Sequence, residues 1–139
     1  MLTREMMDRK LDEHFGFEMR DDVEGVLSTL ADDVEHDIVG WLPGPSFGHE
    51  ATRAFYTATF ADLADGEVRS VRRYHGENFL VDESIWKGTA VGRPFGFEGR
   101  GRSLEFRLLH ILEFAEDGRI TRENVWLDTA AIARQLPQD

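Results

Sequence analysis

The second half of the chain carries the pattern that most restricts its fold. After Asp65-Gly66, the spacing of apolar side chains changes from helical to alternating, and it stays alternating almost to the end of the chain. Alternation with period two is typical of half-buried strands, and it predicts four of them, over residues 68–75, 79–91, 103–114 and 120–128. No helical segment separates these strands, and Asp117-Gly118 is a typical hairpin turn. We therefore expect antiparallel pairing and exclude a parallel α/β fold.

The first half of the chain predicts helices and one strand. The predicted segments are helices over residues 3–15, 21–30 and 48–63, a strand over residues 34–41, and a short last helix over residues 129–136. Thr3 is suited to cap the first helix, and Asp21 or Asp22 the second. Residues 42–46 contain two prolines and predict a loop. The order of elements predicts an α+β fold, a single domain over residues 1–139 with helices on one face of a curved, mainly antiparallel sheet.

Charge and composition exclude several kinds of partner. With 27 acidic and 16 basic side chains, the chain has a formal net charge of −11. Its overall field repels polyanions, so we expect no nucleic-acid partner and no binding to an anionic membrane surface. The N-terminal segment mixes charged and apolar residues and has no apolar run long enough for a signal peptide or a membrane span. We therefore expect a cytoplasmic protein.

Motifs for metals, cofactors and nucleophiles are missing from the sequence. The absence of cysteine excludes disulfides, thiolate zinc sites, iron–sulfur clusters and cysteine nucleophiles. The glycine-rich segment 92–102 lacks the spacing of a phosphate-binding loop and precedes a strand, and His49-Glu50 has no second histidine four residues on. We expect neither a metal nor a cofactor. What remains is acid–base chemistry by polar groups in an apolar pocket, or binding alone.

His110 is the first candidate for such chemistry. It shares one face of its predicted strand with five large apolar residues, namely Leu104, Phe106, Leu108, Leu112 and Phe114. It is either a core histidine whose nitrogens are satisfied by neighbours, or a titratable group aimed into a cavity between sheet and helices. In a cavity, desolvation disfavours the charged imidazole and keeps the ring available as a base.

Two further titratable residues are candidates on other strands. If Val125 and Leu127 mark the inner face of the last strand, Glu123 enters the cavity near its rim; the alternative is an exposed glutamate paired with an arginine. His36 shares a face with Val34 on the first strand. It either points inward or is a polar histidine at a strand end.

Aromatic side chains supply candidates for substrate binding. Trp41, Tyr56, Tyr74 and Trp86 are expected near the cavity or in its wall, although each alone is equally compatible with core packing. The two tyrosines are the more informative, because a buried phenol needs a hydrogen-bond partner and can donate to a developing oxyanion.

Three local sequences and the order of elements resemble the SnoaL-like polyketide cyclase group of the NTF2-like superfamily. The similar segments are Ala54-Phe55-Tyr56 with Phe60, residues 86–92, and the stretch from His110 through Asp117-Gly118 to Trp126-Leu127-Asp128 and Gln135-Leu136. The resemblance covers nearly the whole chain. It implies a cone-shaped α+β barrel (cystatin-like), an apolar internal pocket, a homodimer formed through the open sheet face, and cofactor-independent acid–base chemistry on a hydrophobic, carbonyl-bearing small molecule.

The resemblance also assigns roles to particular residues. Cyclases of this group use an aspartate on the last strand as general acid and base, supported by a strand histidine and a polar residue on the first strand; the latter two positions fall on His110 and His36. The aspartate position falls on Val125, which cannot exchange a proton, so an aldol-cyclase mechanism is not supported.

Three alternatives remain. Glu123 could take the base role. His110 and His36 could form an acid–base pair for an isomerase, dehydratase or hydrolase reaction, with Tyr74 stabilising an enolate. The third alternative is a non-catalytic protein that binds a hydrophobic small molecule with side chains such as Leu108 and Val125.

Overall fold

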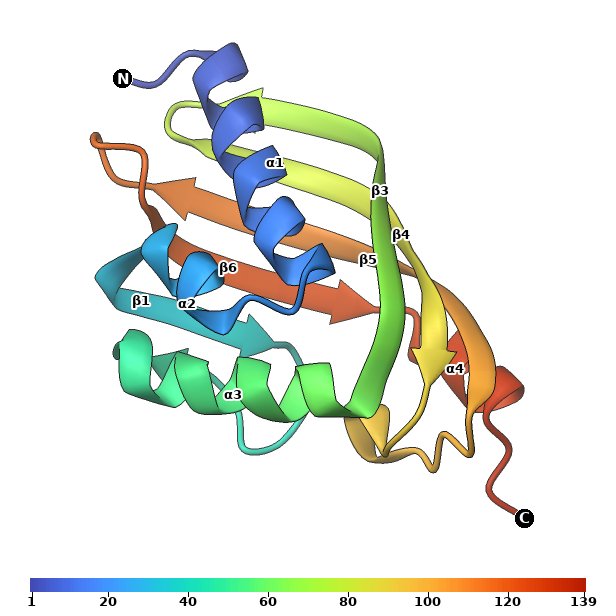
Figure 1. The fold of residues 1–139 in the computed structure, drawn as a ribbon. Helices are drawn as coiled ribbons and strands as arrows, with labels where there is room; N and C mark the ends of the chain where they lie inside the picture. Colours follow the sequence, from blue (N-terminus) through green and yellow to red (C-terminus); the bar gives the residue numbers. More distant parts are fainter.

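A curved six-stranded sheet with four α-helices makes up the protein, which the computed structural model describes over residues 1–139 (Figure 1). The helices are α1 (Arg4–Met19), α2 (Val23–Ser28), α3 (Gly48–Asp62) and α4 (Thr129–Gln135), with a 3-10 turn η1 (Pro94–Gly96). The strands are β1 (Leu30–Ile38), β2 (Ser46–Phe47), β3 (Leu63–Gly76), β4 (Phe79–Ala90), β5 (Arg102–Phe114) and β6 (Ile120–Leu127). Figure 1 shows α1, α2 and α3 on one face of the sheet, which confirms the predicted α+β fold.

The strand order is β2-β1-β6-β5-β4-β3. The neighbouring pairs β3–β4, β4–β5 and β5–β6 are antiparallel, as the hairpin signals predict. β1 joins the sheet parallel to β6, so the sheet is mixed rather than uniformly antiparallel. Register shifts interrupt β3 twice, once between Ser70 and Arg72. Bulges of this kind increase the bend of a strand, and the bent strands make the concave face on which the site lies.

Side-chain caps fix three helix starts. The Thr3 hydroxyl accepts the Met6 N–H at α1, and the Asp22 carboxylate accepts the Gly25 N–H at α2. Asp128 caps α4 in the same way. These caps satisfy backbone donors that a helix leaves unpaired in its first turn. None of the helices combines the length and apolar character needed to cross a bilayer.

The first strand differs most from its prediction. β1 begins at Leu30 rather than residue 34, because Leu30 pairs with Ile120, a partner 90 positions along the chain that local sequence cannot reveal. It ends at Ile38, where Gly40 adopts a φ of 90° and Trp41 donates its N–H to the Ile38 carbonyl in a turn. β2 begins at Ser46, the last residue of the segment predicted as a loop, and pairs with β1.

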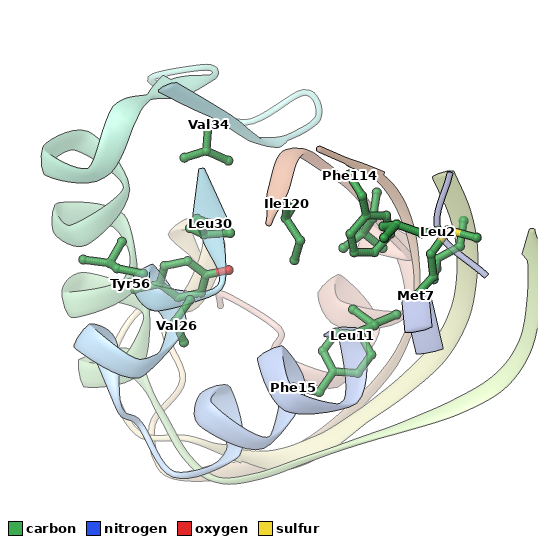
Figure 2. Close-up of a cluster of buried hydrophobic side chains, with 13 residues drawn as sticks. Leu2, Met7, Leu11, Phe15, Val26, Leu30, Val34, Tyr56, Phe114 and Ile120 are labelled. Atoms are coloured by element: carbon green, nitrogen blue, oxygen red, sulfur yellow. The ribbon is translucent and has the colours of Figure 1, made fainter. Parts of the chain in front are cut away.

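Two groups of buried apolar side chains hold the layers together. The larger one joins α1, α2 and α3 to the sheet; Figure 2 shows Leu11 and Phe15 of α1 facing Ile120 and Phe114 of the strands. The smaller one packs α4 against β5 and consists of Ala90, Leu104, Phe106, Ile132 and Leu136. Tyr56 of the larger group and Phe106 of the smaller one also line the candidate site.

The core gives a direct stability prediction. Leu112→Ala should lower the free energy of unfolding by about 2–5 kcal/mol, because Leu112 is 0% exposed and its truncation leaves a cavity. Leu42→Ala removes the same atoms from a side chain that is 95% exposed and should change stability by less than about 0.5 kcal/mol. Urea denaturation of both variants measures the difference. Equal effects would contradict the placement of Leu112 in the core.

Candidate active site

A largely apolar cavity lies between α3 and the concave face of the sheet. Its volume is about 110 Å³, and 13 of its 20 lining residues are hydrophobic. This apolar composition with a few polar groups fits a small-molecule site. The aromatic part of the lining consists of Phe55, Tyr56, Phe60, Trp86, Phe95 and Phe106. Polar groups of the lining include His36, Glu123 and His110, so the three titratable candidates from the sequence meet in one cavity.

Glu123 lies deeper than the rim position predicted for it. It is 1% exposed, so the alternative of a solvated glutamate is wrong. Its Oε1 lies 3.0 Å from Nε2 of His14 and 3.1 Å from the Tyr56 hydroxyl. Figure 2 shows Tyr56 reaching from α3 into the interior. Helix α1 covers this end of the sheet, which is why Glu123 meets a histidine instead of solvent.

His14 is a functional candidate that the sequence analysis missed. Its Nδ1 lies 2.7 Å from the Thr29 hydroxyl, which itself donates to the Val26 carbonyl, so His14 must be the donor of that contact. Nε2 faces Glu123 and, at 3.4 Å, Glu18. Burial alone would lower the pKa of His14, but the two carboxylates outweigh it and raise this pKa to about 10. His14 is therefore an imidazolium at neutral pH.

The same ion pair determines the state of Glu123. Burial alone would raise the pKa of this carboxyl, but the charge and hydrogen bond of His14 hold the pKa of Glu123 well below its usual range. Burial, together with the charges of Glu123 and Glu18, raises the pKa of Tyr56, so the phenol keeps its proton. A carboxylate held this firmly as an anion is a weak proton acceptor. Glu123 thus contributes a fixed negative charge to the end of the cavity formed by His14, Glu18, Tyr56 and Glu123, which we call the cavity floor.

A metal could be considered at this floor. His14, Glu18 and Glu123 each place one ligand atom within 4.8 Å of the others. In the structure, however, these atoms are hydrogen-bonded to one another and to Tyr56, whose hydroxyl donates to Glu18 at 2.8 Å. The positive charge of the group already comes from the His14 imidazolium. The cluster is therefore complete as an ion-pair network.

His36 stands beside this network and is 2% exposed. Its Nε2 lies 3.3 Å from the Tyr56 hydroxyl and 3.7 Å from Oε1 of Glu123. Burial lowers the pKa of His36, with the nearby charge of His14 acting in the same direction against the pull of Glu123 and Glu18. The ring is neutral, and because Nε2 faces a carboxylate, we place the proton there. Nδ1 has no hydrogen-bond partner in the protein.

His110 makes a second histidine–carboxylate pair on the other side. It is 3% exposed and stands directly opposite Asp82 of β4, with Nδ1 3.3 Å from Oδ1 of Asp82 and 3.4 Å from the Ser84 hydroxyl. Its ring packs against Phe15, with 5.0 Å between ring centroids. Its Nε2 has no partner in the protein. His110 therefore presents an unpaired nitrogen in the lining of the cavity.

Asp82 is the second residue that the sequence analysis missed. Burial alone would raise its pKa, but the adjacent His110 ring, together with hydrogen bonds from Ser70 and Arg73, holds the pKa of Asp82 below its usual value. A signal for it exists in the sequence, because Asp82 shares one face of its strand with Leu80, which is fully buried, as His110 does with Leu112. A charged residue in such a row needs a buried partner.

The remaining predicted binding residues divide into two groups. Tyr56, Trp86, Leu108 and Val125 line the cavity. Tyr74 does not, because it pairs with Val81 on the face opposite Leu80 and is 55% exposed; its predicted role towards an enolate is therefore wrong.

Trp41 lies in a second cleft that adjoins the cavity. This cleft is formed by the loop after β1, by α3 and by η1, and it shares His36, Phe55 and Phe95 with the cavity. The Trp41 and Phe95 rings lie 6.1 Å apart. The shared residues make this cleft a route by which a ligand could reach the two histidines.

The family of the chain follows from its sequence. The family model of the SnoaL-like polyketide cyclases matches residues 5–136, and the protein belongs to this family. Its fold is the NTF2-like cone of the structural relatives. The comparison with curated protein sequences gives no match.

Three solved structures illustrate the shared fold. The chain is similar to an NTF2-like protein of unknown function from Burkholderia pseudomallei, at 23% identity and a TM-score of 0.80 over 96% of this chain and 98% of that one. It is similar to TsrD from Streptomyces laurentii, at 19% identity and a TM-score of 0.83 over 99% and 98% of the two chains. It is also similar to an LEH-like epoxide hydrolase from M. tuberculosis, at 18% identity and a TM-score of 0.74 over 94% and 89%.

The buried ion pair predicts a particular pH dependence of stability. The pKa of His14 is 6.5 when unfolded and about 10 when folded, so its contribution is fully present below pH 6.5 and is lost as the pH rises through 10. His14→Gln should therefore destabilise the protein most near pH 6.5, and the gap to wild type should shrink towards pH 10. Urea denaturation across this range measures the gap.

A second variant, Glu123→Gln, tests whether the effect comes from the contact between His14 and Glu123. In a Glu123→Gln background, His14→Gln should show a weaker pH dependence, because only Glu18 then remains to hold the proton on His14. A gap between His14→Gln and wild type that stays constant with pH would show that His14 is neutral in the folded protein.

Proposed function

We propose that the protein is a cofactor-independent enzyme that performs acid–base chemistry on a hydrophobic, carbonyl-bearing small molecule. The observation that carries this proposal is a pair of unpartnered imidazole nitrogens, Nε2 of His110 and Nδ1 of His36, on residues that line one apolar cavity. His36 and His110 are 2% and 3% exposed, so little bulk solvent reaches these nitrogens. An imidazole nitrogen without a partner in the protein, in an apolar cavity, is suited to a hydrogen bond with a bound molecule.

The two histidines have different roles because their neighbours differ. His110 takes a proton from the substrate on Nε2, and the Asp82 carboxylate next to Nδ1 stabilises the positive charge that develops on the ring. His36 stays neutral and accepts a hydrogen bond from a substrate hydroxyl or a water molecule. His110 then returns the proton to another atom of the same substrate. Isomerisation and elimination of water fit this sequence of proton transfers. Hydrolysis fits it when the proton that His110 takes comes from the attacking water molecule and is returned to the oxygen of the broken bond.

The position of the missing aspartate supports this assignment. Val125 stands directly opposite His110 on the neighbouring strand, and Glu123, two residues earlier, stands opposite His36. Val125 therefore lies on the wall between the two histidines and lines the cavity. An apolar residue there leaves proton transfer to the rings beside it. Glu123 is unsuited to the base role because it is paired with His14.

The reaction can be sought with a panel of apolar ketones, epoxides and β-hydroxy carbonyl compounds in deuterated water, using mass spectrometry to detect deuterium uptake, hydration or loss of water. On any compound that turns over, His110→Phe should lower kcat by about 10²–10⁴-fold, the usual contribution of a general acid or base. His36→Phe should lower it as well. His49→Gln, which changes a histidine outside the cavity, should leave it unchanged.

The outcome of this panel also distinguishes an enzyme from a non-catalytic binding protein. Compounds that bind, by quenching of tryptophan fluorescence, but never turn over would favour a non-catalytic binding protein. Turnover that survives His110→Phe unchanged would remove His110 from the mechanism.

We also propose that the protein forms a homodimer through the open face of its sheet. Leu109 and Trp126 stand opposite each other on this face and remain 36% and 39% exposed, and Tyr74 is exposed on the same side. Exposed apolar side chains that form a contiguous group on a sheet mark an interaction surface. The cytoplasmic location expected from the sequence stays a prediction.

The dimer proposal predicts that Trp126→Lys shifts the protein towards the monomer, because it places a charge in the apolar contact. Sedimentation equilibrium measures the shift. Leu42→Lys, which changes a fully exposed leucine elsewhere, is the control and should leave the mass unchanged. A wild-type protein that is monomeric at all concentrations tested would overturn this proposal.

A further inference from the structure

One arginine connects the second histidine–carboxylate pair to helix α1. Arg73 of β3 is 14% exposed and donates from Nε to Oδ2 of Asp82 at 2.9 Å. Its Nη2 donates to Oδ1 of Asp12 at 2.7 Å, and its Nη1 lies 3.2 Å from Oδ1 of Asp8. Three carboxylates thus share one guanidinium. Of the three, only Asp82 is completely buried.

The two oxygens of Asp82 have different surroundings. Oδ2 accepts hydrogen bonds from the Ser70 hydroxyl at 2.6 Å and from Arg73. Oδ1 is buried without a well-aligned hydrogen bond, and it lies 3.3 Å from Nδ1 of His110. The charge of the carboxylate is therefore compensated through one oxygen, while the other is left for the imidazole.

The cost of burying a charge explains why Asp82 needs Arg73 on one oxygen. A buried carboxylate needs a positive partner, and without one it shifts the proton balance of its neighbours. If Arg73 were absent, the only cation available to Asp82 would be a protonated His110. That ring would then hold its proton firmly and could not accept another near neutral pH.

We propose that Arg73 is a positioning residue of the active site, which takes up the charge of Asp82 so that this carboxylate orients His110 without fixing a proton on it. Ser70 assists by holding Oδ2 in place. The inference rests on the proposed function, in which Nε2 of His110 takes up and returns a proton. It adds that the basicity of this histidine is set by an arginine on the edge strand β3, which stands opposite Asp82 and does not line the cavity itself.

Other charged groups also face His110 and must be kept constant in a test. Glu123 and His36 reach the cavity from β6 and β1, and Tyr56 from α3. His14 and Glu18 approach from α1. None of them contacts Arg73 or Asp82, so substitutions at these two positions leave the floor network intact.

The experiment follows the imidazole resonances of the whole isotope-labelled protein by NMR during a pH titration, with the His110 signal assigned by its loss in His110→Phe. In Arg73→Gln, the midpoint of the His110 titration should move to higher pH by at least one unit, a tenfold gain in proton affinity. In Asp82→Asn it should move to lower pH. Arg53→Gln removes an arginine that binds two surface glutamates and should not move it.

A double variant separates charge compensation from a merely structural role. In an Asp82→Asn background, Arg73→Gln should move the His110 midpoint by less than half as much, because the charge to be compensated is gone. This double variant also removes the uncompensated carboxylate that could prevent Arg73→Gln from folding. If Arg73→Gln alone does not fold, a midpoint of the double variant close to that of Asp82→Asn supports the proposal, and a rise of a unit above it overturns it.

The remaining outcomes are equally decisive. An unchanged or lowered midpoint in Arg73→Gln would show that Arg73 does not compensate Asp82 for His110. Because the titration uses no substrate, it can succeed while every compound of the turnover panel fails. In that case the proposed role of Arg73 would be supported, while the proposal that the protein is an enzyme would fail.

Discussion

The buried contact between His14 and Glu123 is the interaction on which the site depends. It joins the first helix to the last strand, with 3.0 Å between Nε2 and Oε1 and both side chains at most 1% exposed. A lone charge in this place would be costly, so each residue keeps the other ionised. The pair fixes the hydroxyl of Tyr56, and Tyr56 in turn faces Nε2 of His36. The orientation of one candidate catalytic ring thus follows from an ion pair that takes no part in proton transfer.

Two histidine–carboxylate pairs in one small protein need not have the same chemistry. The carboxylates at His14 have no other strong cation nearby, so this histidine holds its proton. Asp82 has Arg73 as well, so its charge is compensated without a proton on His110. The number of cations around each carboxylate therefore separates a permanent imidazolium from a usable base. Separation of titratable groups by their environment is how acid and base roles are commonly assigned within a single site.

The fold was more accessible from the sequence than the site. Alternation along residues 103–114 correctly places His110 among buried leucines and phenylalanines, because strand periodicity is a local property. The partners of the site residues are not local. His14 and Glu123 are 109 positions apart, and the sheet order that brings β1 beside β6 depends on the whole chain. Tyr74 was misplaced because its alternating segment does not show which face of a bulged edge strand is turned inward.

The valine at position 125 shows how a site can change its proton-transfer groups without changing its scaffold. Val125 faces His110 across two paired strands, in the wall of a cavity that already holds the Glu123 carboxylate. An aspartate there would add a second anion close to Glu123, with His14 already committed to that glutamate. The apolar side chain avoids this repulsion. Burial in such a cavity favours the neutral imidazole, and the Asp82 carboxylate beside Nδ1 of His110 stabilises the positive charge that a proton transfer creates on that ring.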